Sequence, residues 1–336
     1  MIFLTGGTGL VGAHILLKLT ENGHKVKALK RKESSLNVIE NIFSHYNKVD
    51  LLQSIEWIDG DLLDLFSLEE GIKDCQTVIH CAAIVSFNPK DFEKMMKQNV
   101  EGTANIVNLC LEHNIEKLGY VSSIATLGSV EENKVRTEDD YWKESKSNTQ
   151  YAISKYLSEQ EVWRGIEEGL NSVIVNPSVI LGPGDWTKGS SQMFEKVWSG
   201  LKFYSTGSTG YVDVLDVAEC LIKLLNSTIV NERFILNAGQ MKYREVFDTI
   251  AESLNKPKPH IKVTPFLKEV AWRVEWLKSI ITNKSQLVTK ETASTAMKNK
   301  SFSNQKIVDA LGYEFIPISE SIKRYSQWFL EEHTNS

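Results

Sequence analysis

Short apolar runs and longer amphipathic segments alternate along the first half of the chain. Continuous apolar runs predict buried strands, because the strands of a parallel sheet are covered on both faces. These runs lie at residues 2–5, 25–29, 55–58, 77–80, 118–122 and 172–176. Apolar positions recur with helical spacing at residues 9–22, 68–72, 91–114 and 148–168. This strand–helix–strand order predicts an α/β fold with a doubly wound parallel sheet of the Rossmann type.

The pattern changes after the sixth predicted strand. Proline and glycine interrupt it at residues 177–184, and a loop-rich stretch continues to Gly210. Residues 211–218 open a further helix, and helical patterns resume from about residue 237, with an amphipathic stretch at residues 266–281. We therefore expect a smaller, mostly helical C-terminal domain over the carboxyl ends of the strands, where such sheets bind ligands. The predicted division is a dinucleotide-binding domain of residues 1–176 and 211–236 and a substrate-binding domain of residues 177–210 and 237–336.

Charge and cysteine content narrow the class of protein. The 336 residues include 38 Lys and Arg against 43 Asp and Glu, which argues against a nucleic-acid groove because phosphate binding needs a basic face. No apolar run reaches the ~18 residues of a membrane span. The four cysteines form no C-x-x-C pair, which argues against structural zinc or a disulfide framework and fits a reducing cytoplasm. We expect a cytoplasmic enzyme with a small-molecule substrate and no metal, nucleic acid or membrane partner.

A glycine-rich turn joins the first predicted strand to the first helix. Residues 5–12 read Thr-Gly-Gly-Thr-Gly-Leu-Val-Gly and match both G-x-G-x-x-G and G-x-x-G-x-x-G. Glycine permits the tight turn and lets backbone N–H groups approach a pyrophosphate at the positive end of the helix. A purely structural glycine turn is the alternative interpretation. The pattern predicts a dinucleotide cofactor held by Gly6, Thr8, Gly9, Leu10, Val11 and Gly12.

The end of the second predicted strand bears on the choice between NADP(H) and NAD(H). An NAD-specific site usually has an acidic residue ~20 positions after the glycines, where it accepts the ribose 2′-OH. Here that place reads Lys30-Arg31-Lys32, and the first acid is Glu33. Arg31 is best placed to hold a 2′-phosphate through a charge-assisted fork, so NADP(H) is favoured over NAD(H). A solvated charge run after a strand is the alternative.

Two further strand ends carry candidate cofactor contacts. After the third strand, Asp61 and Leu62 belong to a turn whose carboxylate can accept the adenine amino group, although a plain surface turn is the alternative. The fourth strand ends at His80, which we interpret as a buried, hydrogen-bonded histidine rather than a catalytic base. Small residues follow it and let the backbone lie against the nicotinamide ribose: Cys81, Ala82 and Ala83.

The candidate catalytic residues follow the fifth strand and begin the helix at residues 148–168. Tyr151 lies 28 residues after Ser123, and Lys155 shares one helix face with it at spacing i, i+4. A tyrosine keeps its proton until pH ~10, and a nearby lysine cation lowers that pKa toward the working range. Lys155 can also hold the ribose hydroxyls of the cofactor. Ser123 can donate a hydrogen bond to a substrate oxygen and orient it.

These motifs together resemble the extended short-chain dehydrogenase/reductases (the NAD-dependent epimerase/dehydratase superfamily), most of all their dihydroflavonol 4-reductase and 3β-hydroxysteroid dehydrogenase branch. The resemblance runs through segments 5–12, 59–61, 80–83, 99–103, 122–123, 151–155, 176–184, 212–218 and 304–313. It implies Ser123, Tyr151 and Lys155 as the catalytic set and Asn99 as a structural or proton-relay residue at the cofactor. It also implies a homodimer paired through the helices at 91–114 and 148–168, and four residues near the nicotinamide: Pro177, Ser178, Val179 and Ile180.

Two departures from the family bear on function. Its sugar-nucleotide epimerases carry an Asn-x-Tyr-Gly-Pro type segment, whereas residues 178–183 here read Ser-Val-Ile-Leu-Gly-Pro. Its plant flavonoid reductases have Asn or Asp where this chain has Gly128. The favoured function is an NADP(H)-dependent oxidoreductase that reduces a ketone or aldehyde, with Tyr151 as proton donor. A nucleotide-sugar epimerase or dehydratase and a non-enzymatic NADP-sensing regulator are the alternatives.

The substrate pocket is expected to be fairly hydrophobic. Its predicted lining consists of Val85, Ser86, Phe87, Leu127 and residues 186–204, many of which are aromatic or apolar. Ordinary packing between the two domains explains the same residues equally well.

Overall fold

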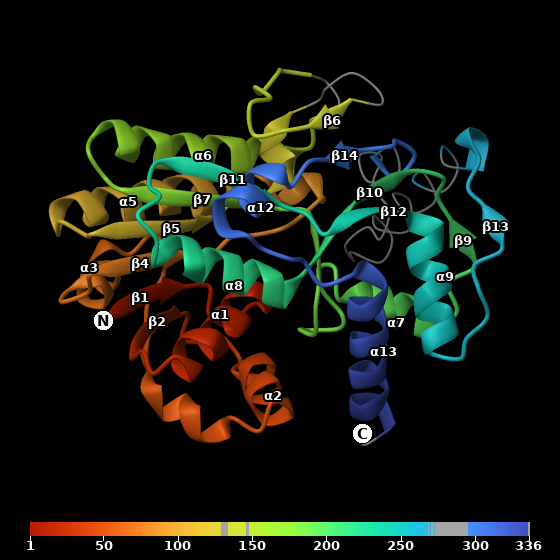
Figure 1. The fold of residues 1–336 in the computed structure, drawn as a ribbon, viewed down its shortest axis with the longest axis horizontal. Coiled ribbons are helices and arrows are strands. Elements are labelled where there is room, and N and C mark those ends of the chain that lie inside the picture. The colour runs from red at the N-terminus through yellow and green to blue at the C-terminus, as the bar shows by residue number, and fades with distance from the viewer. Residues whose placement is uncertain (129–133, 146–147, 268, 270–271, 273–294, 335–336) are drawn as a thin grey trace.

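A parallel sheet forms the centre of the fold (Figure 1). The computed structural model describes residues 1–128, 134–145, 148–267, 269, 272 and 295–334. The strands of this sheet are β1 (Ile2–Thr5), β2 (Val26–Lys30), β3 (Ile55–Asp59), β4 (Thr77–His80), β5 (Lys117–Val121), β7 (Ser172–Pro177) and β11 (Glu232–Leu236). Their order is β11-β7-β5-β4-β1-β2-β3, and every neighbouring pair is parallel. The predicted doubly wound Rossmann sheet is confirmed.

Helices cover both faces of the sheet and create two cores. One face carries α1 (Leu10–Glu21), α2 (Asn37–His45) and α8 (Val214–Leu225), and the other carries α3 (Leu65–Ile72), α5 (Gly102–Glu112) and α6 (Gln150–Glu167). Successive strand residues point to opposite cores: Leu4 and Ile79 pack with the first set, and Phe3 and Val78 pack with the second. Because both faces are buried, the strands appear in the sequence as continuous apolar runs.

The chain reverses its direction of travel across the sheet at β1, which pairs with β2 on one side and with β4 on the other. A reversal of this kind leaves a crevice outside the carboxyl ends of the strands, and ligands bind there. The loops that follow β3, β2, β1, β4, β5 and β7 therefore lie along one edge of the sheet in that order.

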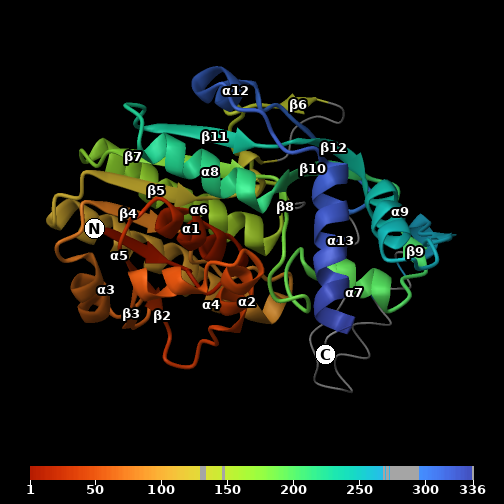
Figure 2. The same cartoon turned by 60° about the horizontal axis from the view of Figure 1, so that its bottom comes forward.

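Elements from later in the chain gather at one end of the molecule. The small strands are β6 (Val135–Arg136), β8 (Val179–Leu181), β9 (Phe203–Tyr204), β10 (Ser208–Asp213), β12 (Gly239–Lys242), β13 (Ile261–Lys262) and β14 (Ser301–Phe302), and they form the sheets β12-β10-β8, β13-β9 and β14-β6. The helices are α7 (Gln192–Trp198), α9 (Tyr243–Ser253), α12 (Gln305–Leu311) and α13 (Ile318–Thr334). Figures 1 and 2 both place α7, α9 and α13 together, far from α3. The domain boundaries given above stay a prediction.

Two expected helices differ from the structure. The helix predicted to open at Tyr211 begins only at Val214, because Tyr211 and its neighbours pair with β8 and β12 and the Asp213 carboxylate caps the helix. The helix predicted at residues 91–114 is interrupted by a π-helical segment, Met96–Glu101. The region after residue 237 also contains short strands, so it is less helical than expected.

Two further parts of the sequence analysis concern the later chain. Strand β11 was not predicted, although it completes the main sheet beside β7. The amphipathic stretch expected at residues 266–281 lies largely outside the described residues.

Candidate functional site

The predicted site residues follow six neighbouring strands at the carboxyl edge of the sheet. Asp61 and Leu62 follow β3, Arg31 follows β2, the glycine turn follows β1, Cys81, Ala82 and Ala83 follow β4, Ser123 follows β5, and Ser178 follows β7. In the order of the strands, the roles predicted for these residues run from adenine through pyrophosphate to nicotinamide. The fold therefore aligns them as an extended dinucleotide requires.

The glycine turn has no room for side chains at two of its positions. Gly6 has a φ of +80°, and a Cβ there would lie 2.7 Å from the Ala82 nitrogen. A Cβ at Gly12 would lie 2.1 Å from the Gly6 oxygen. Gly9 is the exposed N-cap of the 12-residue helix α1, and its Cβ would come no closer than 3.4 Å to that oxygen. Bare backbone at the positive end of α1 fits a pyrophosphate.

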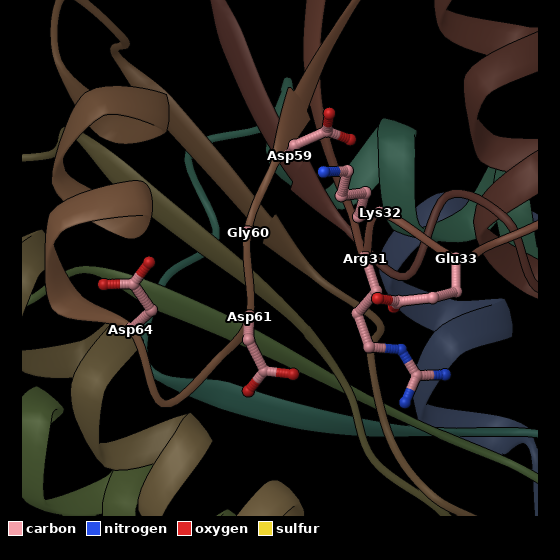
Figure 3. Close-up of a pocket in the computed structure, with 7 residues that line it drawn as sticks. All are labelled: Arg31, Lys32, Glu33, Asp59, Gly60, Asp61 and Asp64. Atoms are coloured by element: carbon pink, nitrogen blue, oxygen red, sulfur yellow. The ribbon is translucent and has the colours of Figure 1, made fainter.

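Six charged residues and one glycine line a hollow at the ends of β2 and β3 (Figure 3): Arg31, Lys32, Glu33, Asp59, Asp61 and Asp64, with Gly60. In Figure 3 the side chains of Arg31 and Asp61 extend from opposite walls toward the same open space. The side chains of Arg31 and Lys32 form no hydrogen bond or ion pair with the described residues. Both cations are thus available to an anionic ligand group.

Three carboxylates of this hollow are already engaged by the fold. Asp59 forms an ion pair with Lys30. Asp61 Oδ1 accepts a hydrogen bond from the Gln98 amide at 2.9 Å. Asp64 caps α3 by accepting the backbone N–H of Phe66 at 3.2 Å. The first cation of the Lys-Arg-Lys run is therefore occupied, whereas the second and third are not.

His80 is fully buried between two threonines. Its Nδ1 lies 2.6 Å from Thr5 Oγ1, and its Nε2 lies 3.0 Å from Thr103 Oγ1. Burial lowers the pKa of His80 to about 3, so the ring is neutral at physiological pH. The interpretation of His80 as a buried, hydrogen-bonded histidine is confirmed.

Asn99 is turned into the interior by the π-helical segment Met96–Glu101 and is 1% exposed. Its Oδ1 accepts the backbone N–H of Ile84 at 2.7 Å, and its Nδ2 donates to the Ile84 carbonyl at 3.0 Å and to Ser154 Oγ at 3.1 Å. Asn99 thereby ties the loop after β4 to helix α6. Its predicted contact with the cofactor stays a prediction.

Ser123 and Tyr151 lie at the carboxyl edge of the main sheet, at the end where the nicotinamide is expected. Ser123 begins a 3-10 turn, Ile124–Leu127, and its Oγ accepts the backbone N–H of Ala125 at 3.1 Å. Tyr151 lies in the first turn of α6, with its phenol near the side chain of Ser123. Burial raises the pKa of Tyr151, and the polar side chain of Ser123 opposes that rise. The ring of Phe87 stands edge-on to Tyr151, with centroids 5.8 Å apart.

Lys155 is buried one helical turn after Tyr151. Its Nζ donates to Tyr120 Oη at 2.7 Å and to the Val121 carbonyl at 3.0 Å, so it is anchored at the end of β5. Burial lowers the pKa of Lys155 to about 8, and the carboxylate of Glu159 opposes this effect. The cation therefore lies in the same buried region as Tyr151 and can act on its phenol through space.

The residues after β7 lie where the nicotinamide end is expected. Pro177 ends β7, and the N–H of Ser178 donates to the Leu236 carbonyl at 2.9 Å. Ser178 Oγ is buried and has no hydrogen-bond partner among the described residues. Val179 and Ile180 are half-buried in β8. The predicted contact of Ser178 with the cofactor stays a prediction.

The predicted substrate pocket is only partly supported. Val85 and Phe87 are 58% and 39% exposed, and Phe87 stands beside Tyr151. Leu127, Trp186 and Phe194 are buried in hydrophobic clusters, so their assignment to the pocket lining was wrong. An apolar side chain looks the same in the sequence whether it lines a pocket or fills a core.

Sequence reasoning missed two residues around Lys155. Tyr120 accepts its hydrogen bond, and Glu159 follows it at the same i, i+4 spacing that links Tyr151 to Lys155. That spacing places all three on one helix face, and it was the available signal for Glu159.

No helix within the described ranges is both long and apolar enough to cross a membrane. Among the same residues, no group of His, Cys, Asp or Glu side chains is arranged to hold a metal ion. All four cysteines are free thiols.

A model of the NAD dependent epimerase/dehydratase family matches residues 2–239, which include the whole main sheet and its carboxyl edge. The chain belongs to this family. The resemblance to the extended short-chain dehydrogenase/reductases is thereby confirmed. Proteins of this family use NAD(P). The relatives of this chain include reductases and dehydrogenases, so this member of the epimerase/dehydratase family is an oxidoreductase enzyme.

Individual relatives cover nearly the whole chain. A putative dihydroflavonol 4-reductase of Synechocystis sp. is 29% identical over 97% of this chain and 94% of its own length. Cinnamoyl-CoA reductase 1 of Petunia hybrida is 26% identical over 96% of this chain and 90% of its own. The crystal structure of gox2253 has 30% identity and a TM-score of 0.81, covering 99% of this chain and 98% of that one. The dTDP-glucose 4,6-dehydratase DesIV of Streptomyces venezuelae, crystallised with NAD, shares the fold with a TM-score of 0.78 at 17% identity, covering 98% of this chain and 97% of its own.

Proposed function

We propose that this protein interconverts a ketone or aldehyde and the corresponding alcohol with NADP(H). The observation that carries the proposal is the placement of Ser123, after β5, beside buried Tyr151 in the first turn of α6, with Lys155 buried one helical turn away. Relatives named as reductases over almost the full chain support a reductase rather than an epimerase.

The proton chemistry follows from the contacts of these side chains. When bound, the cofactor supplies or accepts the hydride. Ser123 Oγ accepts the Ala125 N–H, and its own hydrogen can turn from Tyr151 to a substrate carbonyl oxygen and polarise it. Tyr151 delivers its proton to that oxygen as negative charge develops there. The Lys155 cation, one helical turn away, favours the phenolate that remains.

The preference for NADP(H) is the finer part of the proposal. Arg31 is exposed and unpaired within the described chain, and it faces the hollow where a 2′-phosphate is expected. Asp59, at the end of the neighbouring strand, is neutralised by Lys30 and offers little attraction to a ribose hydroxyl. The two cations of this lining whose side chains have no partner among the described residues, Arg31 and Lys32, are therefore the groups that we expect to meet a 2′-phosphate.

The substrate side of the site is apolar. Phe87 presents a partly exposed ring to Tyr151, and Val85, two residues before it, is also exposed, so we expect a carbonyl compound with a hydrophobic body. A homodimer paired through α5 and α6 belongs to the same proposal, and light scattering after size-exclusion chromatography tests it.

The decisive experiment incubates the protein with NADPH and a panel of aliphatic and aromatic aldehydes and ketones. We expect NADPH absorbance to fall with at least one of them, and Tyr151→Phe to lower turnover by ~10²-fold or more with little change in NADPH affinity. Tyr141→Phe, at a tyrosine that is 85% exposed, is the matched control and keeps parental activity. Interconversion of a sugar nucleotide without net cofactor turnover would instead show an epimerase or dehydratase. NADPH binding without any reaction would indicate a regulator.

A further inference from the structure

A buried carboxylate beyond the proposed catalytic residues connects them to the rest of the fold. We propose that Glu159 is a positioning residue for the proposed reaction, because it fixes the backbone on both sides of Ser123 and places a negative charge one helical turn beyond Lys155. The catalytic consequence rests on the proposed function, whereas the structural part rests on the contacts of the Glu159 side chain.

One oxygen of Glu159 holds the Ser123 loop. Oε2 accepts Ser122 Oγ at 2.5 Å and Thr126 Oγ1 at 2.9 Å, and these residues lie on either side of Ser123 in the chain. The amide of Asn176, at the end of β7, donates to the same oxygen at 2.8 Å and to the Ser123 carbonyl at 3.1 Å. The backbone that aims Ser123 is therefore fixed from two strands and one helix.

The other oxygen of Glu159 binds a residue of β11, the edge strand beside β7. Oε1 lies 3.1 Å from Arg233 Nη1 and accepts Trp163 Nε1 at 3.3 Å. Arg233 belongs to β11 and also donates to the carbonyls of Glu138 and Asp140. Glu159 is 1% exposed, so this is a buried ion pair whose geometry is set by several neighbours.

The same carboxylate acts on the charge of Lys155. Burial lowers the pKa of Lys155, and Glu159 is the largest influence in the opposite direction. The titratable and charged groups around the pair are Cys81 after β4, His80 on β4, Tyr120 on β5, Tyr151 on α6 and Arg233 on β11. His80 is neutral, and burial raises the pKa of Cys81 to about 12 and holds the pKa of Tyr120 far above its usual value. Glu159 is therefore the carboxylate that favours the protonated form of Lys155, and a lysine cation one helical turn from Tyr151 favours the Tyr151 phenolate in turn.

The test compares two variants that break the same ion pair from opposite sides, Glu159→Gln and Arg233→Gln. Glu167→Gln, an exposed position on the same helix, is the matched control. The readout is the pKa of Tyr151 in the NADP⁺-saturated protein, taken from ultraviolet phenolate absorbance with Tyr151→Phe as the blank in each background. Turnover with NADPH and the best carbonyl compound is measured in parallel.

We expect Glu159→Gln to raise the pKa of Tyr151 by about one unit and to lower kcat by ~10-fold or more. Arg233→Gln leaves that pKa unchanged or lowers it, because the anion beside Lys155 remains, and Glu167→Gln changes neither quantity. A double variant, Glu159→Gln with Arg233→Gln, leaves no unpaired buried charge, keeps the pKa rise and serves if the single variant does not fold.

The two proposals fail in different ways. If the role of Glu159 is only structural, the pKa of Tyr151 changes equally in Glu159→Gln and Arg233→Gln, or in neither. That result overturns the inference about Glu159. The expected opposite behaviour in a protein that reduces no carbonyl compound would support the inference and overturn the proposed function.

Discussion

Replacing Arg31 by alanine tests how the cofactor is chosen. Arg31 is exposed, is unpaired among the described residues and faces the hollow between β2 and β3 (Figure 3). A charge-assisted contact with a 2′-phosphate is worth about 1.5–3 kcal/mol. At ~1.4 kcal/mol per decade, this corresponds to a preference of about 10- to 150-fold for NADP(H) over NAD(H). Arg31→Ala should remove most of that preference by weakening NADP(H) alone.

The assay is a fluorescence titration of both reduced cofactors against parent and variant. Lys25→Ala is the matched control, because Lys25 is an exposed cation just before the opposite end of β2 and its loss changes the net charge equally. Raising the salt concentration should shrink the preference of the parent, since an exposed contact is screened. Equal affinity of the parent for the two cofactors, or an equal loss for both in Arg31→Ala, would refute the reasoning.

Three other perturbations test separate features. Gly12→Ala puts a Cβ 2.1 Å from a backbone oxygen and should lower the free energy of unfolding by about 1–3 kcal/mol and the Tm by several degrees. The control Gly9→Ala meets nothing closer than 3.4 Å and should keep the parental Tm. Equal melting curves for the two variants would contradict this. Burial raises the pKa of Asp216 to about 7 from 3.8, so the folded state binds this proton more tightly and its contribution to the free energy of unfolding falls as pH rises from about 4 to 7. The free energy of unfolding, measured with urea at pH 5 and pH 8, should lose this part of its pH dependence in Asp216→Asn. An unchanged pH dependence would contradict the role of Asp216. Phe87→Ala should raise KM for an aromatic carbonyl compound ~10-fold with NADPH affinity unchanged, and steady-state kinetics in which KM stays constant would remove Phe87 from the substrate site.

The sheet was predictable because its strands are apolar on both faces. Phe3 and Leu4 pack in different cores, so β1 is a continuous apolar run that a sequence scan detects. Strand β11 escaped detection because it begins with two charged residues, one of which, Arg233, turns inward to an ion pair. The first residues of β10 were assigned to a loop and the last to a helix for a similar reason, since their strand character comes from pairing with β8 and β12.

The site was predictable only where one short motif contains the chemistry. The glycine turn and the i, i+4 pair Tyr151 and Lys155 are local patterns, and the fold aligns them along one edge. Arg233, the ion-pair partner of Glu159, lies 74 residues farther along the chain on strand β11, and a single sequence carries no signal for such a pairing. The pocket lining was overestimated for Leu127, because apolarity alone does not distinguish a wall from a core.

The position of β11 in the chain has a consequence for how the protein is made. Arg233 is translated 56 residues after Pro177, the last residue of β7, with which β11 pairs (177 to 233). At about 5–20 residues per second, a ribosome needs about 3–11 s to cover that distance. During this interval Glu159 lacks the Arg233 guanidinium, and β7 is an open strand edge able to pair with another chain. The edge closes only when β11 docks on β7.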